Sequence, residues 1–302
     1  MNWRKWFEVK EFEFGTVEMM LIRAGFAYAL WTSFFFGIAQ AAQTMPVGLA
    51  HFMDLSFLQD TPTYQALRWG FAGALALWVL GVATPLATGY MLFLISAVGS
   101  LRNSYGNIHH GTQVIGMTVL GYFAGYVWSW LKKDESRSRL KRFLKPDRQD
   151  HQRATWWAMQ AVAATYVVAG VSKLLISGLG WLTGLVNLPL HVEKIGLQHY
   201  FGLGDMGRYE HAKEMAAMLT SWPLTSLVVV GSGLFFELFA FWAIYSRWHA
   251  FAFGVILWGM HVVIAWLMQL EFPMNCWALG LLFVNVPFLV LWPLRRLGLN
   301  VR

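Results

Sequence analysis

The sequence predicts an all-α, polytopic integral membrane protein, a single helical bundle with about eight transmembrane helices. Of the 302 residues, 57% are hydrophobic and only 13% are charged, whereas a soluble domain carries about 25% charged residues. The 17 tryptophans and 23 phenylalanines fit a protein whose aromatic side chains gather at the membrane interfaces. We therefore expect residues 1–302 to form one transmembrane domain, with the lipid bilayer as its first partner.

The spans are predicted from apolar runs that approach the roughly 20 residues needed to cross the hydrocarbon core. Such runs lie at 17–42, 65–83, 86–102, 112–131, 155–176, 222–245, 249–270 and 275–294. The second and third are short and are separated only by Ala83, Thr84 and Pro85. Merging them gives seven spans, which is the alternative count.

The distribution of charge favours eight spans and sets the orientation. Nine of the 23 lysines and arginines lie within 132–153, and others lie near both ends of the chain. Eight spans place all these basic segments on one side, which the positive-inside rule makes cytoplasmic. Acidic residues dominate the other side: Asp54, Asp60, Glu193, Asp205, Glu210, Glu214 and Glu271. This clustering at span ends explains the net charge of +7 without nucleic acid, and it predicts cytoplasmic N- and C-termini.

Two segments fall outside the spans. The basic segment 132–153 is expected to be a cytoplasmic hairpin or surface helix. The segment 177–221 contains Gly178, Gly180 and Gly184 beside an apolar stretch, and it is too rich in glycine for a confident span. We expect an extracytoplasmic interfacial or re-entrant helix there, followed by an ordered loop.

Lys173 is the most informative single residue. It is the only amine in the apolar stretch 165–176, and an ionisable group placed in hydrocarbon is usually functional or paired. Desolvation lowers the pKa of a lysine toward the range where the neutral amine accepts protons. The sequence therefore nominates Lys173 as a base held in an apolar setting.

Other polar residues of the spans are candidates with ordinary alternatives. Arg23 either snorkels to the headgroups or forms an ion pair inside the bundle, with Glu237 as a possible partner. Glu237 and His261 are mid-span groups, and each alone is commonly an interhelical hydrogen-bond partner. His109 and His110 occupy a short connection on the predicted outer face, where a histidine pair is commonly just solvated.

Several chemistries find little support. Paired histidines with a carboxylate can hold zinc or iron, but no HxxxH or HExxH spacing occurs, so no metal is predicted. There is no GxSxG elbow, and no Walker glycine pattern is present. Cys276 is the only cysteine, which excludes an intramolecular disulfide or a CxxC centre.

The stretch 166–174, Tyr-Val-Val-Ala-Gly-Val-Ser-Lys-Leu, followed by Trp181 and Gly184, resembles the signature of the vitamin K-dependent γ-glutamyl carboxylase superfamily, whose bacterial members share the HTTM membrane domain. The Gly-x-Gly-Leu-x-x-acid-Leu run that ends at Leu238 is similar to the next helix of that family. The position of His261 is similar to that of a histidine found on a helix in the same family. Asn107 with His109 or His110, and preferably His110, resembles its Asn-His motif on the luminal side.

The resemblance implies an enzyme. The lysine at the position of Lys173 would deprotonate a reduced naphthoquinone, of the vitamin K or menaquinone type. Dioxygen would then add to give an alkoxide that removes a γ-proton from glutamate, and carbon dioxide would capture the carbanion. In this scheme His109 or His110 holds the quinol oxygen, while Tyr166, Trp181, Glu237 and His261 position groups around it. The site would face the extracytoplasmic side of a bacterial inner membrane.

The sequence also departs from that family. Ser172 stands where a second lysine is expected, and the acidic stretch before Trp181 is replaced by 175–180, Leu-Ile-Ser-Gly-Leu-Gly. The large luminal region is absent from the sequence given, so a peptide substrate would need a separate binding subunit. Two other functions therefore stay open: a non-catalytic maturation or export factor for a peptide or toxin, and a transporter, although no repeat symmetry supports the latter.

Overall fold

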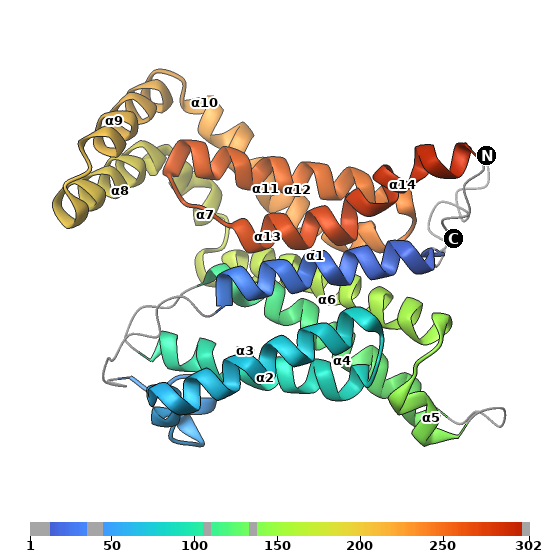
Figure 1. The fold of residues 1–302 in the computed structure, drawn as a ribbon. Helices are drawn as coiled ribbons and strands as arrows, with labels where there is room; N and C mark the ends of the chain where they lie inside the picture. Colours follow the sequence, from blue (N-terminus) through green and yellow to red (C-terminus); the bar gives the residue numbers. More distant parts are fainter. Residues whose placement is uncertain (1–12, 35–44, 105–109, 133–137, 298–302) are drawn as a thin grey trace.

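The computed structural model describes residues 13–34, 45–104, 110–132 and 138–297. Within these ranges the chain forms helices joined by short turns, and no strand occurs. The all-α prediction is confirmed for the described residues. Figure 1 shows long helices running side by side, with a pair of helices projecting from one end.

The first half of the chain packs in sequence order. It contains α1 (Thr16–Phe34), η2 (Gly48–His51), η3 (Ser56–Leu58), α2 (Thr61–Leu80), α3 (Thr84–Asn103), η4 (His110–Thr112), α4 (Gln113–Leu131) and α5 (Arg139–Leu144). Neighbours along the chain are also neighbours in space, because α1 contacts α2, α2 contacts α3, and α3 contacts α4.

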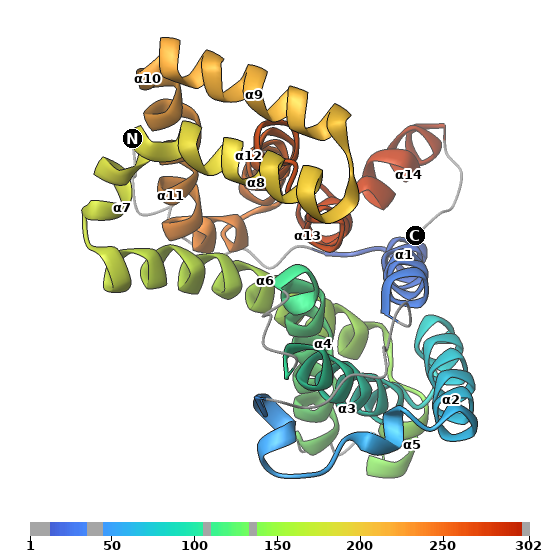
Figure 2. The same ribbon diagram turned by 90° about the vertical axis from the view of Figure 1, so that its left-hand side faces the viewer.

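The second half begins with the longest helix, α6 (Arg148–Ser177), which crosses between the two halves of the bundle (Figure 2). It continues through α7 (Gly180–Thr183), η5 (Gly184–Asn187), α8 (Leu188–Leu203), α9 (Met206–Ser221), α10 (Pro223–Thr225), η6 (Ser226–Val230) and α11 (Gly231–Leu238). It ends with η7 (Ala240–Ile244), α12 (Arg247–Met268), α13 (Pro273–Ala278), η8 (Leu279–Phe283) and α14 (Val286–Arg296).

Five described helices are long and apolar enough to cross a membrane. They are Thr84–Asn103, Gln113–Leu131, Arg148–Ser177, Arg247–Met268 and the run Pro273–Leu294, and a sixth span is possible if α9 and Pro223–Leu238 are taken together. The two parts of that pair are bent by 100°. These helices are consistent with an integral membrane protein.

The two N-terminal spans of the sequence prediction also form helices, α1 and α2. Both carry charged side chains, Glu18 and Arg23 in α1 and Arg68 in α2, which lower their mean hydropathy. The break between the second and third predicted spans lies where expected: α2 ends at Leu80 and is followed by Gly81, which has a positive φ of 73°, and α3 begins at Thr84. Residues 35–42 of the first predicted span lie outside the described residues.

Close packing against α4 fixes the position of α6. A Cβ atom on Gly121 would lie 2.6 Å from the Cα of Ala158, and one on Gly125 would lie 2.6 Å from the Cα of Ala154. Small residues spaced four apart on both helices therefore let the two backbones approach closely, as in many membrane helix pairs. A capping box of Asp147 and Asp150 begins α6 in the basic segment.

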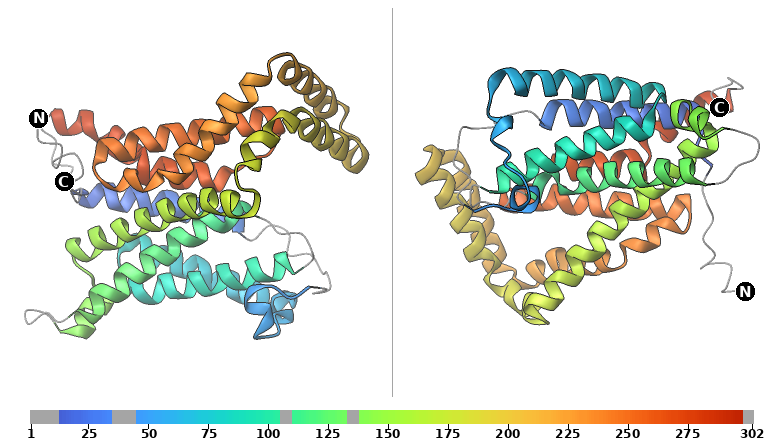
Figure 3. Two further views of the ribbon diagram at one scale, coloured as in Figure 1. Left: turned by 180° about the vertical axis from the view of Figure 1, so that it is seen from behind. Right: turned by 90° about the horizontal axis from the view of Figure 1, so that it is seen from below.

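The segment 177–221 corrects one prediction. An interfacial helix followed by an ordered loop was expected, but almost all of the segment is helical, and α8 and α9 form an antiparallel hairpin (Figure 3). Its core contains Leu188, Val192 and Leu219. The loop prediction was wrong because the apolar positions of α8 and α9 cover each other and α12, and this contact is not visible in the sequence of either helix alone.

Candidate functional site

Lys173 forms an ion pair with Glu237. The lysine lies one turn before the end of α6, and its Nζ donates a hydrogen bond to Glu237 Oε2 of α11 at 2.6 Å. The Lys173 side chain is 33% exposed and that of Glu237 only 8%. The neighbours of the amine in sequence are apolar, and α11 brings a carboxylate to it, as expected for an ionisable group that is paired inside an apolar stretch. Glu237 was considered as a partner of Arg23 and pairs with Lys173 instead.

Gly170 allows this approach of α11 to α6. A Cβ atom at this position would lie 3.1 Å from side-chain carbons of Leu238 and 3.2 Å from the Leu238 backbone nitrogen. Gly170 lies three residues before Lys173, so the two residues share one face of α6. The absence of a side chain at Gly170 thus brings the end of α11 close enough for the ion pair.

Trp181 completes the surroundings of the amine. The chain leaves α6 at Gly178, which has a positive φ of 56°, and the short helix α7 follows. The Lys173 Nζ lies 5.0 Å from the centroid of the Trp181 ring, a distance at which a cation is attracted to an aromatic face. The amine therefore contacts both a carboxylate and an indole ring, and all three residues were selected from the sequence.

The pair lines a cavity of about 730 Å³, within the range of about 300–1,000 Å³ for small-molecule sites. The walls are largely apolar and include Leu185, Val229, Phe236, Met260 and Phe272. The polar side chains among the lining residues are those of Lys173, Glu237, His191 and Ser232, with the indole of Trp181. One wall includes Val228, Val229 and Val230 of the π-helical turn η6, and such turns occur frequently at functional sites.

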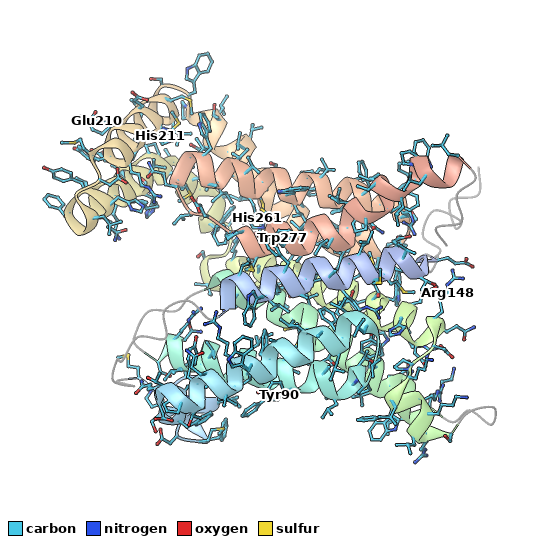
Figure 4. All side chains as sticks on the ribbon, viewed as in Figure 1. Tyr90, Arg148, Glu210, His211, His261 and Trp277 are labelled. Carbon is cyan, nitrogen blue, oxygen red and sulfur yellow. The ribbon has the colours of Figure 1, made fainter. Side chains whose placement is uncertain are left out.

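A second polar group joins the three helices α6, α12 and α13. The Tyr166 hydroxyl of α6 lies 2.8 Å from Nε2 of His261 in α12, and Asn275 Nδ2 of α13 lies 3.3 Å from the same nitrogen. Figure 4 shows His261 between α12 and α13. The tautomer of the His261 ring and the orientation of the Asn275 amide decide which atom donates in each of these contacts. Among the residues that the structure describes, neither His261 Nδ1 nor Asn275 Oδ1 has a hydrogen-bond partner.

The two polar groups adjoin one another. Tyr166 lies seven residues before Lys173, two turns away on the same face of α6. Phe272 lines the cavity and its ring centroid lies 5.2 Å from that of His261. The structure thus brings together five of the residues selected from the sequence: Tyr166, Lys173, Trp181, Glu237 and His261.

The Asn-His motif is only partly described. Asn107 and His109 lie outside the described residues, as does the side chain of His110. The turn that begins at His110, η4, contacts α13, the helix that carries Asn275. The backbone of this turn therefore lies on the side of the bundle that holds the Tyr166–His261–Asn275 group.

Sequence reasoning missed Asn275 and His191. Asn275 is 8% exposed, and its only signal was a polar amide beside Cys276 at the start of an apolar run. His191 lies in the segment expected to be a loop, so no face could be assigned to it. Among the described residues, no group of three or more His, Cys, Asp or Glu side chains is placed to hold a metal ion.

Comparisons with known proteins add no family assignment. No family model matches the chain, and neither a curated protein nor a solved structure matches it. The likeness to the γ-glutamyl carboxylase superfamily therefore rests on the residues quoted above.

Proposed function

We propose that this protein is a quinol-binding membrane enzyme. Its substrate or cofactor is a reduced naphthoquinone of the vitamin K or menaquinone type, held in the cavity beside Lys173 and Glu237. The observation that carries this proposal is an ion pair on the wall of a largely apolar cavity, within a bundle of helices long enough to cross a membrane. A lipid-soluble aromatic diol suits such a site, because its ring fits apolar walls and its hydroxyl needs a polar partner.

Lys173 is the proposed base. Transfer of the ammonium proton across the 2.6 Å hydrogen bond to Glu237 would leave a neutral amine and a neutral carboxylic acid. The largely apolar surroundings lower the cost of this transfer, since desolvation disfavours charged groups. The amine can then take the hydroxyl proton of a quinol: the quinol O–H bond breaks, a lysine N–H bond forms, and the resulting ammonium holds the oxygen anion.

The bound quinol would supply an oxidisable ring for reaction with dioxygen, and carbon dioxide is a further candidate co-substrate. Trp181 offers an aromatic face beside the amine at 5.0 Å. Tyr166, His261 and Asn275 support the adjoining wall. The apolar cavity limits access of water to the reactive ring, which protects an oxygenated product from side reactions.

We further propose that the bundle has about eight spans, with α1 and α2 as the first two. The basic end of the bundle would face the cytoplasm of a bacterial cell and the α8–α9 hairpin the outside. This orientation places the cavity in the outer half of the bilayer, where a lipid quinol can enter from the side.

Mass spectrometry of lipids extracted from the purified protein tests the proposal. We expect a co-purifying quinone from wild type and at least tenfold less from Lys173→Met. Lys194→Met, which changes an exposed lysine of α8, is the matched control and should retain the quinone. Oxygen uptake with reduced menaquinone-4 should follow the same order. Wild-type protein without quinone and without oxygen uptake would refute the proposal.

A protein or peptide partner is the second candidate, and the tip of the α8–α9 hairpin favours it. Phe201 is 80% exposed, Leu203 73% and Met206 50%, on a feature that projects from the end of the bundle (Figure 1). Such a partner could be a substrate peptide or a separate substrate-binding subunit. Stable co-purification of a polypeptide, with no redox-active lipid, would favour the maturation or export factor over the enzyme.

A further inference from the structure

The short helix α5 has an outward face that combines exposed leucines with cations. Leu140 is 67% exposed and Leu144 47%, and their spacing of four residues places them on one side of the helix. Arg139 and Lys141, which flank Leu140, are also exposed, and the segment 138–145 contains four basic residues and no acidic one. Within the described ranges, no carboxylate forms an ion pair with either Arg139 or Lys141.

The inner face of α5 is fixed to the bundle. Phe143 packs edge-on against Trp130 of α4, with ring centroids 5.4 Å apart. Arg142 is 7% exposed, and its Nη1 donates a hydrogen bond to the Lys132 carbonyl at 2.5 Å. The backbone nitrogen of Ala83, in the turn between α2 and α3, donates to the carbonyl of the last α5 residue at 2.9 Å. These contacts hold the helix in one orientation, so the exposure of its outward face is a property of the fold.

The helix α5 lies between the ends of two candidate membrane spans. It connects α4 to α6, at the end of the bundle opposite the α8–α9 hairpin (Figure 1). Two exposed tryptophans occur at this end, Trp128 in the last turn of α4 (56%) and Trp248 in the first turn of α12 (80%), and such tryptophans are typical of the headgroup layer. Leu80 and Leu86, on either side of the α2–α3 turn, are 72% and 59% exposed. This end of the bundle therefore has the side chains expected where headgroups and acyl chains meet.

The chemistry of the outward face selects its occupant. Exposed leucines alone suit any apolar surface, but Arg139 and Lys141 add two positive charges beside them. An anionic phospholipid offers both complements at once, because its phosphate lies at headgroup level and its acyl chains begin just below. A zwitterionic lipid carries a cation of its own, so it neutralises the two side chains less well. Arginine and lysine are long enough to keep their charged ends in water while the leucines beside them are buried in lipid.

We propose that the outward face of α5 is a docking surface for anionic phospholipid of the surrounding bilayer. Leu140 and Leu144 enter the boundary between headgroups and acyl chains, while Arg139 and Lys141 stay at the hydrated level of the headgroups and bind lipid phosphates. Because α5 is attached to α4 and to the α2–α3 turn, this contact would hold the basic end of the bundle at a fixed depth. The surface lies at the opposite end of α6 from the cavity at Lys173 and does not require a quinol there.

Lipid-dependent thermal unfolding of the purified full-length protein tests the role of charge. Phosphatidylglycerol or phosphatidylcholine with identical acyl chains is titrated into the protein in detergent, and the rise in Tm gives an apparent dissociation constant for each lipid. We expect wild type to bind phosphatidylglycerol more tightly than phosphatidylcholine. The double variant Arg139→Gln with Lys141→Gln should bind phosphatidylglycerol more weakly, by about fivefold for each cation removed, and phosphatidylcholine as before.

A matched control removes the same charge from the other end of the molecule. Lys194→Gln with Lys213→Gln changes two exposed lysines of the α8–α9 hairpin and should bind both lipids as wild type does. All four substituted side chains are exposed, so the Tm of each variant without added lipid should stay close to that of wild type.

The depth of position 140 in a bilayer tests the apolar part. In a Cys276→Ser background, a nitroxide is attached at Leu140→Cys and the protein is placed in nanodiscs that contain phosphatidylglycerol. The nitroxide should collide more with dissolved oxygen than with a water-soluble nickel chelate, because oxygen concentrates in the hydrocarbon. A nitroxide at Glu210→Cys, on the exposed face of α9, should show the reverse.

Three results would overturn the proposal. Equal binding of the two lipids by wild type would show that the cations of α5 do not select an anion. An equal loss of phosphatidylglycerol binding in the control pair would trace the effect to net charge and not to this helix. Free access of the chelate to position 140 would place α5 in bulk water, as expected for a surface that binds a soluble acidic protein.

Discussion

The Lys173–Glu237 pair shows how two charges can be kept inside an apolar bundle. Glu237 is only 8% exposed, so its carboxylate depends on the lysine for solvation. Removing one member of a buried pair costs more than the pair itself contributes, because the remaining charge has no partner.

Lys173→Met should therefore destabilise the protein, by about 1–3 kcal/mol. The larger loss of stability that follows when a fully buried ion pair is broken is not expected, because the Lys173 side chain is 33% exposed. Adding Glu237→Leu should restore most of the loss, since the orphaned carboxylate is then gone. Thermal unfolding of the wild type, both single variants and the double variant gives a double-mutant cycle, which measures the coupling between the two side chains. Additive losses would show that the two side chains are not coupled in the folded protein.

These residues could be selected from the sequence as candidates, but their partners could not. A lysine or a glutamate in an apolar run stands out at once, and Lys173, Glu237 and His261 were found in this way. Which charges meet depends on the rotation and depth of each helix, and apolar periodicity fixes neither. Arg23 therefore had Glu237 as a candidate partner, whereas the structure gives it His151 and Tyr126.

At the scale of helices, glycines decide which side chains meet. Gly170 faces Leu238 across the contact of α6 with α11, whereas Gly259, in the middle of α12, has open space at its Cβ position. The two positions form a natural comparison, because both are helical glycines near the cavity and only one lies at a close contact.

Gly170→Val should push α11 away from α6 and separate Lys173 from Glu237. We expect a stability loss of about 2–4 kcal/mol, from overpacking together with the weakened ion pair. Gly259→Ala should be neutral or stabilise by up to about 1 kcal/mol, because it improves helix propensity without a clash. Unfolding in detergent measures both. Tolerance of valine at position 170 would show that the close approach is not needed.

The helical hairpin α8–α9 marks the limit of prediction at this scale. The glycines at positions 178, 180 and 184 indicated irregular structure. Gly178, which has a positive φ of 56°, does follow the last residue of α6. The helices beyond it are stabilised by tertiary contacts, including a hydrogen bond from His211 Nε2 to the Trp266 carbonyl at 2.7 Å. Such contacts override weak local propensity, and a single sequence does not display them.

At the scale of the molecule, charge is divided between the two ends of the bundle. Arg148 donates a hydrogen bond to the Phe14 carbonyl, and Arg247 pairs with Glu18, so the starts of α1, α6 and α12 lie together. Glu210 and His211 lie at the opposite end (Figure 4). The predicted gathering of basic segments at one end is confirmed for these helices. The side of the membrane that each end faces follows from the positive-inside rule and stays a prediction.

Cysteine labelling in intact spheroplasts decides that orientation. In a Cys276→Ser background, Glu210→Cys places a thiol on the exposed face of α9, and Arg139→Cys places one on the exposed start of α5. The basic end should remain inside, because lysine and arginine near span ends resist translocation. A membrane-impermeant maleimide should therefore label position 210 in intact spheroplasts and position 139 only after lysis. The reverse pattern would mean the opposite orientation, with the Lys173 cavity on the cytoplasmic side. Labelling of both positions before lysis would contradict a bundle that spans the bilayer with its ends on opposite faces.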